Sequence, residues 1–104
     1  MIYLVLHGET EWNRQRRFQG RLDSPLTPYG LEQARRVGST LGRLIKDPAM
    51  CRLMSSPLGR ARQTAEIICA ALGVSSVQLA LDPRLMEIDL GSWAGLTRAE
   101  VEAK

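Results

Sequence analysis

The sequence predicts an α/β protein in which helices flank a mainly parallel β-sheet. Short apolar runs that resemble strands alternate along the chain with segments of helical periodicity, an order typical of parallel sheets. The first run, residues 2–6, is apolar throughout, as expected for a strand that is covered on both faces. With 104 residues, the chain is expected to form one domain over residues 1–104.

Two long helices are predicted between the strands, and each is opened by a capping residue followed by proline. A Thr-Pro pair at residues 27–28 begins the first helix, and an Asp-Pro pair at residues 47–48 ends it. A Ser-Pro pair at residues 56–57 begins the second helix, which ends at Gly73. The apolar residues with helical spacing are Leu31, Ala34, Val37, Leu41 and Ile45 in the first helix, and Leu58, Ala61, Ala65, Ile68 and Leu72 in the second.

The remaining segments complete the alternation. Further strands are predicted at residues 50–55 and 77–81. Residues 14–30 and 82–96 are rich in polar residues, glycine and proline, which indicates loops. Residues 97–100 form a capping-box pattern that opens a last helix.

The composition excludes several classes of protein. Hydrophobic residues make up 44% and charged residues 24%, which is ordinary for a globular domain. The net charge of +3 is small for a nucleic-acid binder, and the arginines of residues 14–21 fit a solvated or substrate-bordering loop better. The apolar start is short, lacks a basic leader and does not approach a membrane span, so we expect a cytoplasmic protein with no membrane partner. Cys51 and Cys69 lack metal or redox spacing, which predicts free thiols and no metal site.

Three chemically useful side chains follow the three predicted strands. His7, the only histidine, comes directly after the first strand, Arg60 lies on the opening turn of the helix after the second, and Glu87 follows the third. Ligands of open α/β sheets bind beyond the carboxyl ends of the strands. The sequence therefore predicts that a nucleophile, an anion clamp and a carboxylic acid meet at one edge of the sheet.

This combination suits phosphoryl transfer. An imidazole can attack phosphorus and form a phosphohistidine, and the reaction needs positive charge on the non-bridging oxygens and a proton for the leaving group. Arg60, near a helix N-terminus, suits the first task, and a protonated Glu87 suits the second. Gly8 allows the phosphate to approach the backbone closely.

Four successive motifs resemble the histidine phosphatase superfamily, in its phosphoglycerate-mutase-like branch. They are LVLHGETEWN, GRLDSPLTPYGLEQA, SSPLGRARQTAEI and RLMEIDLGSWAG, and they extend from about residue 2 to residue 96. The resemblance implies a three-layer α/β/α fold and phosphate-ester chemistry on a small-molecule substrate, without a metal or an organic cofactor. It also implies that His7 is the nucleophile, Arg60 a phosphate-binding residue and Glu87 the proton donor. By the same resemblance, Asn13 lies near the phosphate, and the residues that border the substrate are Arg14, Gln19, Gly20 and Arg21.

The chain departs from the family pattern at two places. Leu6 stands where the family has a phosphate-binding arginine, and the later His-Gly motif is absent, so we expect a domain that is incomplete at its C-terminus. The chain is then either a truncated piece or is completed by a second subunit, an exchanged segment or a rearranged sheet. The sequence therefore predicts an impaired phosphomonoester phosphatase. The alternative is a catalytically inactive module that binds phosphate-bearing ligands or a partner chain.

Overall fold

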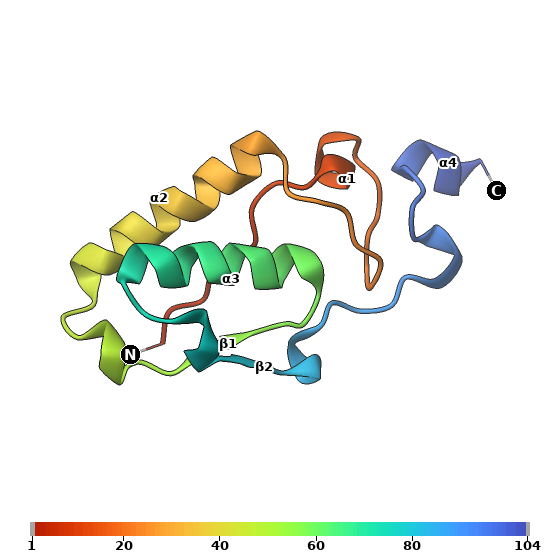
Figure 1. Cartoon of the computed structure of the whole chain (residues 1–104). Helices are drawn as coiled ribbons and strands as arrows, with labels where there is room; N and C mark the ends of the chain where they lie inside the picture. The colour runs from red at the N-terminus through yellow and green to blue at the C-terminus, as the bar shows by residue number, and fades with distance from the viewer. Residues whose placement is uncertain (1, 104) are drawn as a thin grey trace.

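The computed structural model describes residues 2–103, and two long helices dominate it (Figure 1). Short 3₁₀ turns connect several of the elements. The helices and strands in chain order are α1 (Glu11–Arg14), α2 (Pro28–Leu44), β1 (Leu53–Ser55), α3 (Gly59–Leu72), β2 (Leu79–Leu81) and α4 (Arg98–Glu102).

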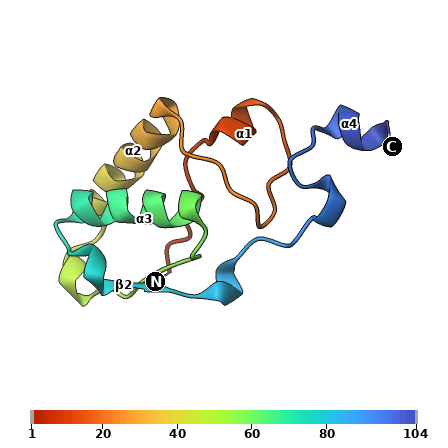
Figure 2. The same cartoon turned by 45° about the vertical axis from the view of Figure 1, so that its right-hand side comes forward.

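The sheet consists of β1 and β2, which pair in parallel. Leu53 lies opposite Leu79 and Ser55 opposite Leu81, and α3 makes the crossover between the two strands. α3 packs on both strands and α2 packs on α3, so the two long helices lie on the same side of the sheet (Figures 1 and 2). The predicted α/β class with a parallel sheet is therefore confirmed.

The predicted strand at residues 2–6 is not formed. These residues have no strand assignment, and the side chains of Ile2, Leu4 and Leu6 are 85%, 93% and 89% exposed. A strand exists only through hydrogen bonds with a neighbouring strand, and no described residue supplies one to this segment. The predicted strand is therefore wrong for the described residues: the apolar pattern is typical of a strand, but this segment pairs with no neighbouring strand.

The helix boundaries follow local chemistry. Thr27 caps α2, because its hydroxyl accepts a hydrogen bond from the Gly30 N–H at 3.0 Å. α3 begins at Gly59, later than predicted, and ends at Gly73, whose φ of 73° is left-handed. The Thr97 hydroxyl caps α4, as the capping-box pattern predicts.

The core lies where α2 meets α3. Its buried apolar side chains include Ala34, Ile68 and Cys69. Gly38 allows the close approach, since a Cβ added there would lie 2.6 Å from the Cβ of Ala71. Within residues 2–103, no helix is both long and apolar enough to cross a membrane.

Candidate functional site

The segment that follows His7 is held between the two long helices. The Gly8 N–H donates to the Thr64 hydroxyl on α3 at 3.1 Å, and the Glu9 N–H donates to the Gln33 side chain on α2 at 2.8 Å. Gly8 also lies against the backbone of Gly30, with no room for a side chain at either residue. The two glycines therefore permit a close crossing that fixes the position of the backbone next to His7.

The hydrogen bond of His7 determines which of its ring nitrogens is available. His7 is half-buried, and its Nδ1 lies 2.6 Å from the Gly8 carbonyl oxygen. A carbonyl oxygen only accepts, so Nδ1 carries the proton in this bond. In the neutral imidazole the lone pair then resides on Nε2. His7 is thus held in the tautomer whose available lone pair is on Nε2.

Arg60 is buried and is bound on one side by a single loop. Its exposed fraction is 4%. Nη1 donates to the Leu22 carbonyl at 2.6 Å and to Asp23 Oδ1 at 3.3 Å, and Nη2 donates to the Gly20 carbonyl at 2.6 Å. The Nε–H and the second Nη2 hydrogen have no acceptor among residues 2–103. A guanidinium binds oxyanions through such pairs of parallel N–H groups, and these two N–H groups of Arg60 are left without a protein acceptor.

Thr64 connects the His7 segment to the start of α3. Its hydroxyl donates to the Arg60 carbonyl at 2.8 Å and accepts from the Gly8 N–H. The sequence-predicted nucleophile and anion clamp therefore lie on segments in direct contact. The convergence of the His7 ring and the Arg60 guanidinium on one oxyanion stays a prediction.

The predicted residues around α1 have structural partners. Asn13 closes a capping box, because its side-chain oxygen accepts from the Thr10 N–H at 3.0 Å. Arg14 is exposed and pairs with Glu11 at 3.1 Å. Gln19 is buried, and its side-chain oxygen accepts from the hydroxyls of Thr10 and Ser24. These contacts tie the start of the loop to the segment that follows His7.

Among residues 2–103, the Glu87 carboxylate forms no hydrogen bond with His7 or Arg60. Glu87 is exposed, and its Oε1 accepts from the neighbouring Ile88 N–H at 2.9 Å. Only its backbone is linked to the loop, since the Arg21 Nε donates to the Glu87 carbonyl at 3.2 Å. Glu87 therefore lies on a segment that the loop contacts, while its carboxylate is hydrogen-bonded to the backbone of the next residue.

Sequence reasoning missed Thr64, Gln33 and Asp23. Thr64 lies four residues after Arg60, on the same face of α3, so helical spacing could have indicated it. Gln33 and Asp23 act across tertiary contacts for which the sequence has no local signal. Among residues 2–103, no group of three His, Cys, Asp or Glu residues is arranged to hold a metal ion.

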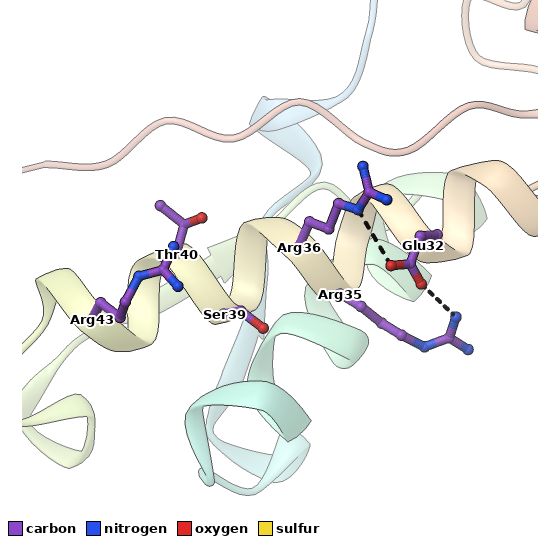
Figure 3. A pocket seen from close by; sticks show the side chains of 6 residues that line it. All are labelled: Glu32, Arg35, Arg36, Ser39, Thr40 and Arg43. Atoms are coloured by element: carbon purple, nitrogen blue, oxygen red, sulfur yellow. Dashed lines mark hydrogen bonds and ion pairs between the residues drawn. The ribbon is translucent and has the colours of Figure 1, made fainter.

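A separate hollow lies on the outer face of α2 (Figure 3). It is a shallow polar depression in which Glu32 forms ion pairs with Arg35 and Arg36. None of the sequence-predicted site residues lines this hollow. The residues that do are Glu32, Arg35, Arg36, Ser39, Thr40 and Arg43.

The fold is that of a known class of protein. The chain belongs to the histidine phosphatase superfamily (branch 1), whose family model matches residues 2–104. The resemblance predicted from the four motifs is therefore confirmed.

Particular relatives share about a third to a half of the residues. The chain is 48% identical over 90 residues to the "Probable phosphoglycerate mutase GpmB" of Escherichia fergusonii, covering 86% of this chain and 39% of that protein. YhfR of Bacillus stearothermophilus is 40% identical with a TM-score of 0.76, over 93% of this chain and 45% of that one. A mycobacterial glucosyl-3-phosphoglycerate phosphatase in complex with VO₃ is 37% identical with a TM-score of 0.78, over 93% of this chain and 43% of that one. The fold is thus phosphoglycerate-mutase-like, and the chain spans about two fifths of the length of the curated relatives it matches.

Proposed function

We propose that this chain hydrolyses small-molecule phosphomonoesters through a phosphohistidine on His7. The observation that carries the proposal is the Nδ1 contact of His7 with the Gly8 carbonyl, because it leaves the lone pair on Nε2, the nitrogen that would attack phosphorus. Membership of the histidine phosphatase superfamily supports the same role. A mycobacterial relative is a glucosyl-3-phosphoglycerate phosphatase, which supports a phosphorylated small molecule as the substrate class.

The proposed reaction has two displacements at phosphorus. Nε2 of His7 forms the N–P bond while the ester P–O bond breaks, and the leaving alcohol takes a proton from an acid. Water then attacks the phosphohistidine and releases inorganic phosphate. The free edge of Arg60 balances the charge on two non-bridging oxygens in both steps. Gly8 and Asn13 lie beside the phosphate, and the loop that contains Arg14, Gln19, Gly20 and Arg21 borders the rest of the substrate.

Glu87 is the proposed proton donor, and substrate binding has to redirect its carboxyl group. In the free protein that group accepts from the Ile88 N–H, a bond that a small rotation would break. The backbone of Glu87 accepts a hydrogen bond from Arg21, which ties its segment to the loop proposed to border the substrate. Three further expectations stay predictions. The protein is expected to be cytoplasmic, its sheet to be completed by a second copy or an exchanged segment, and its domain over residues 1–104 to be incomplete.

Leu6 is proposed to impair the reaction. The family has an arginine beside the nucleophile, and the Leu6 side chain supplies neither charge nor donor. Loss of one such donor costs about 3–4 kcal/mol of transition-state stabilisation, or roughly 10²–10³ in rate.

The second candidate function is an inactive module that binds phosphate-bearing ligands or a partner chain. Two observations favour it: the Glu87 carboxylate is exposed and engaged locally, and Leu6 is exposed where a cationic clamp is expected. Such a module would retain the anion edge of Arg60 but would not turn substrate over.

Hydrolysis of p-nitrophenyl phosphate separates the two functions. The enzyme predicts weak turnover that His7→Ala abolishes and that Leu6→Arg raises by about 10²–10³. Leu4→Arg is the matched control, because Leu4 is equally exposed in the same segment and its replacement should leave the rate unchanged. Equal background rates for all four proteins would leave only the binding module.

A further inference from the structure

The loop before α2 surrounds Arg60 with acceptors on one side only. The carbonyls of Gly20 and Leu22 and the carboxylate of Asp23 together bind three of the five guanidinium N–H groups. We propose that Asp23 is a positioning residue, which holds the Arg60 guanidinium so that its Nε and Nη2 edge faces the phosphate. This inference rests on the proposed function, since it concerns the residue that would bind the phosphate.

One oxygen of Asp23 binds both ends of Arg60. Oδ1 accepts from the Arg60 backbone N–H at 3.1 Å and from Nη1 at 3.3 Å. Both bonds have to be satisfied together, so the guanidinium folds back toward the start of its own helix. A side chain held at both its backbone and its tip has few other rotamers available.

Asp23 also replaces the missing cap of α3. Leu58, at the N-cap position, makes no side-chain capping bond, so an N–H of the first turn needs an acceptor from elsewhere. Asp23 supplies this acceptor and places a negative charge at the positive end of the helix. Gly59 makes room for it, because a Cβ added at Gly59 would clash with the Asp23 carboxylate.

The burial of Arg60 explains why the loop matters for the anion site. The Arg60 side chain is 5% exposed, whereas that of Asp23 is 38% exposed. A buried guanidinium without hydrogen-bond acceptors is costly. The loop therefore determines which N–H groups of Arg60 are hydrogen-bonded within the protein and which are left without an acceptor. Removing Asp23 releases an Nη1 donor and lets the guanidinium rotate, which misaligns the free edge.

Three measurements on the full chain test the role of Asp23. The first is the affinity for orthovanadate by isothermal titration calorimetry, and the second is the order of the Arg60 side chain from its ¹⁵Nε–¹H NMR relaxation. The third is the midpoint of urea unfolding. The variants are Asp23→Ala, Asp23→Asn and Arg60→Ala. The matched control is Asp82→Ala, since Asp82 also accepts from a backbone N–H and a guanidinium, those of Arg84.

The positioning role predicts a specific pattern. Asp23→Ala weakens vanadate binding at least about tenfold, the size expected when a hydrogen bond to a charged group is lost, and it increases the mobility of the Arg60 Nε–H. Asp23→Asn keeps an acceptor at Oδ1 and restores both readouts to within about threefold. Asp82→Ala changes neither.

Three outcomes would overturn the role. Tighter vanadate binding in both Asp23 variants would mean that the carboxylate competes with the anion. A lower unfolding midpoint with unchanged affinity and unchanged Arg60 order would mean that Asp23 only caps α3. If the wild type and Arg60→Ala both fail to bind vanadate, the proposed function fails, and the NMR order of Arg60 still decides: unchanged order in Asp23→Ala refutes positioning, and lost order supports it.

Discussion

Replacing Gly30 by alanine tests how tightly the segment that carries His7 is held against α2. A Cβ at Gly30 would lie 2.8 Å from the Glu9 nitrogen and 2.9 Å from the Glu9 carbonyl carbon, and it would clash with the Glu9 oxygen. These are backbone atoms, which cannot rotate away as a flexible side chain can. The same Glu9 oxygen accepts from the Thr27 N–H at 2.9 Å, so a shift of Glu9 also strains this bond.

The magnitude is the balance of three terms. Over-packing costs about 1–3 kcal/mol, and a weakened backbone hydrogen bond costs about 0.5–1.5 kcal/mol. Alanine in place of glycine in a helix returns about 0.5–1 kcal/mol. Gly30→Ala should therefore lower the free energy of unfolding by about 0.5–4 kcal/mol, and for a domain of this size Tm falls by roughly 4–8 °C per kcal/mol.

Gly42→Ala is the matched control on the same helix. An added Cβ there would come no nearer than 3.9 Å to Leu72, so only the gain in helix propensity remains. Urea unfolding followed by circular dichroism measures both variants. A free energy of unfolding for Gly30→Ala within about 0.5 kcal/mol of that for Gly42→Ala would refute the tight crossing.

Two further predictions concern titratable groups away from the site. Cys69 is 1% exposed, and burial, with a smaller effect of Glu66, raises the pKa of its thiol, so Ellman's reagent should modify Cys51 first and Cys69 only on unfolding. A native Cys51→Ser protein that reacts rapidly would contradict this. The hydrogen bonds of Arg84 lower the pKa of the Asp82 carboxyl from 3.8 to about 2. The pair's contribution to stability is therefore present above pH 3.8 and lost as the pH falls through 2. The difference in Tm between wild type and Asp82→Asn should shrink over that range, and a constant difference would show that the carboxylate is not stabilised by Arg84.

The helices were predictable because their signals are local. Thr27 and its following proline mark the start of α2 within three residues, and Gly73 ends α3 by adopting a left-handed conformation. The strand at residues 2–6 was not correctly predicted, because an apolar run records burial in a sheet but not whether the neighbouring strand is present. β1 and β2 are paired and are connected by α3, whereas residues 2–6 pair with no strand among the described residues.

The candidate site was predictable only in part. His7 and Arg60 were proposed from their places after predicted strands, and the structure puts their segments in contact through Thr64. Their shared role at one oxyanion stays a prediction. The contact between Asp23 and Arg60 could not be predicted from the sequence, because its two hydrogen bonds join residues that are 37 positions apart. The backbone of Glu87 contacts the loop through Arg21, but its carboxylate accepts a local backbone bond that no motif encodes. The predicted meeting of Glu87 with His7 and Arg60 therefore stays a prediction.

The exposed run at residues 2–6 also has a consequence for how this chain behaves at high concentration. It is uncharged, contains no proline and leaves its backbone donors and acceptors unpaired among the described residues. Segments with these properties stack into cross-β fibrils when they remain accessible. Residues 2–6, which lead into His7, are thus disposed to self-assembly into insoluble material.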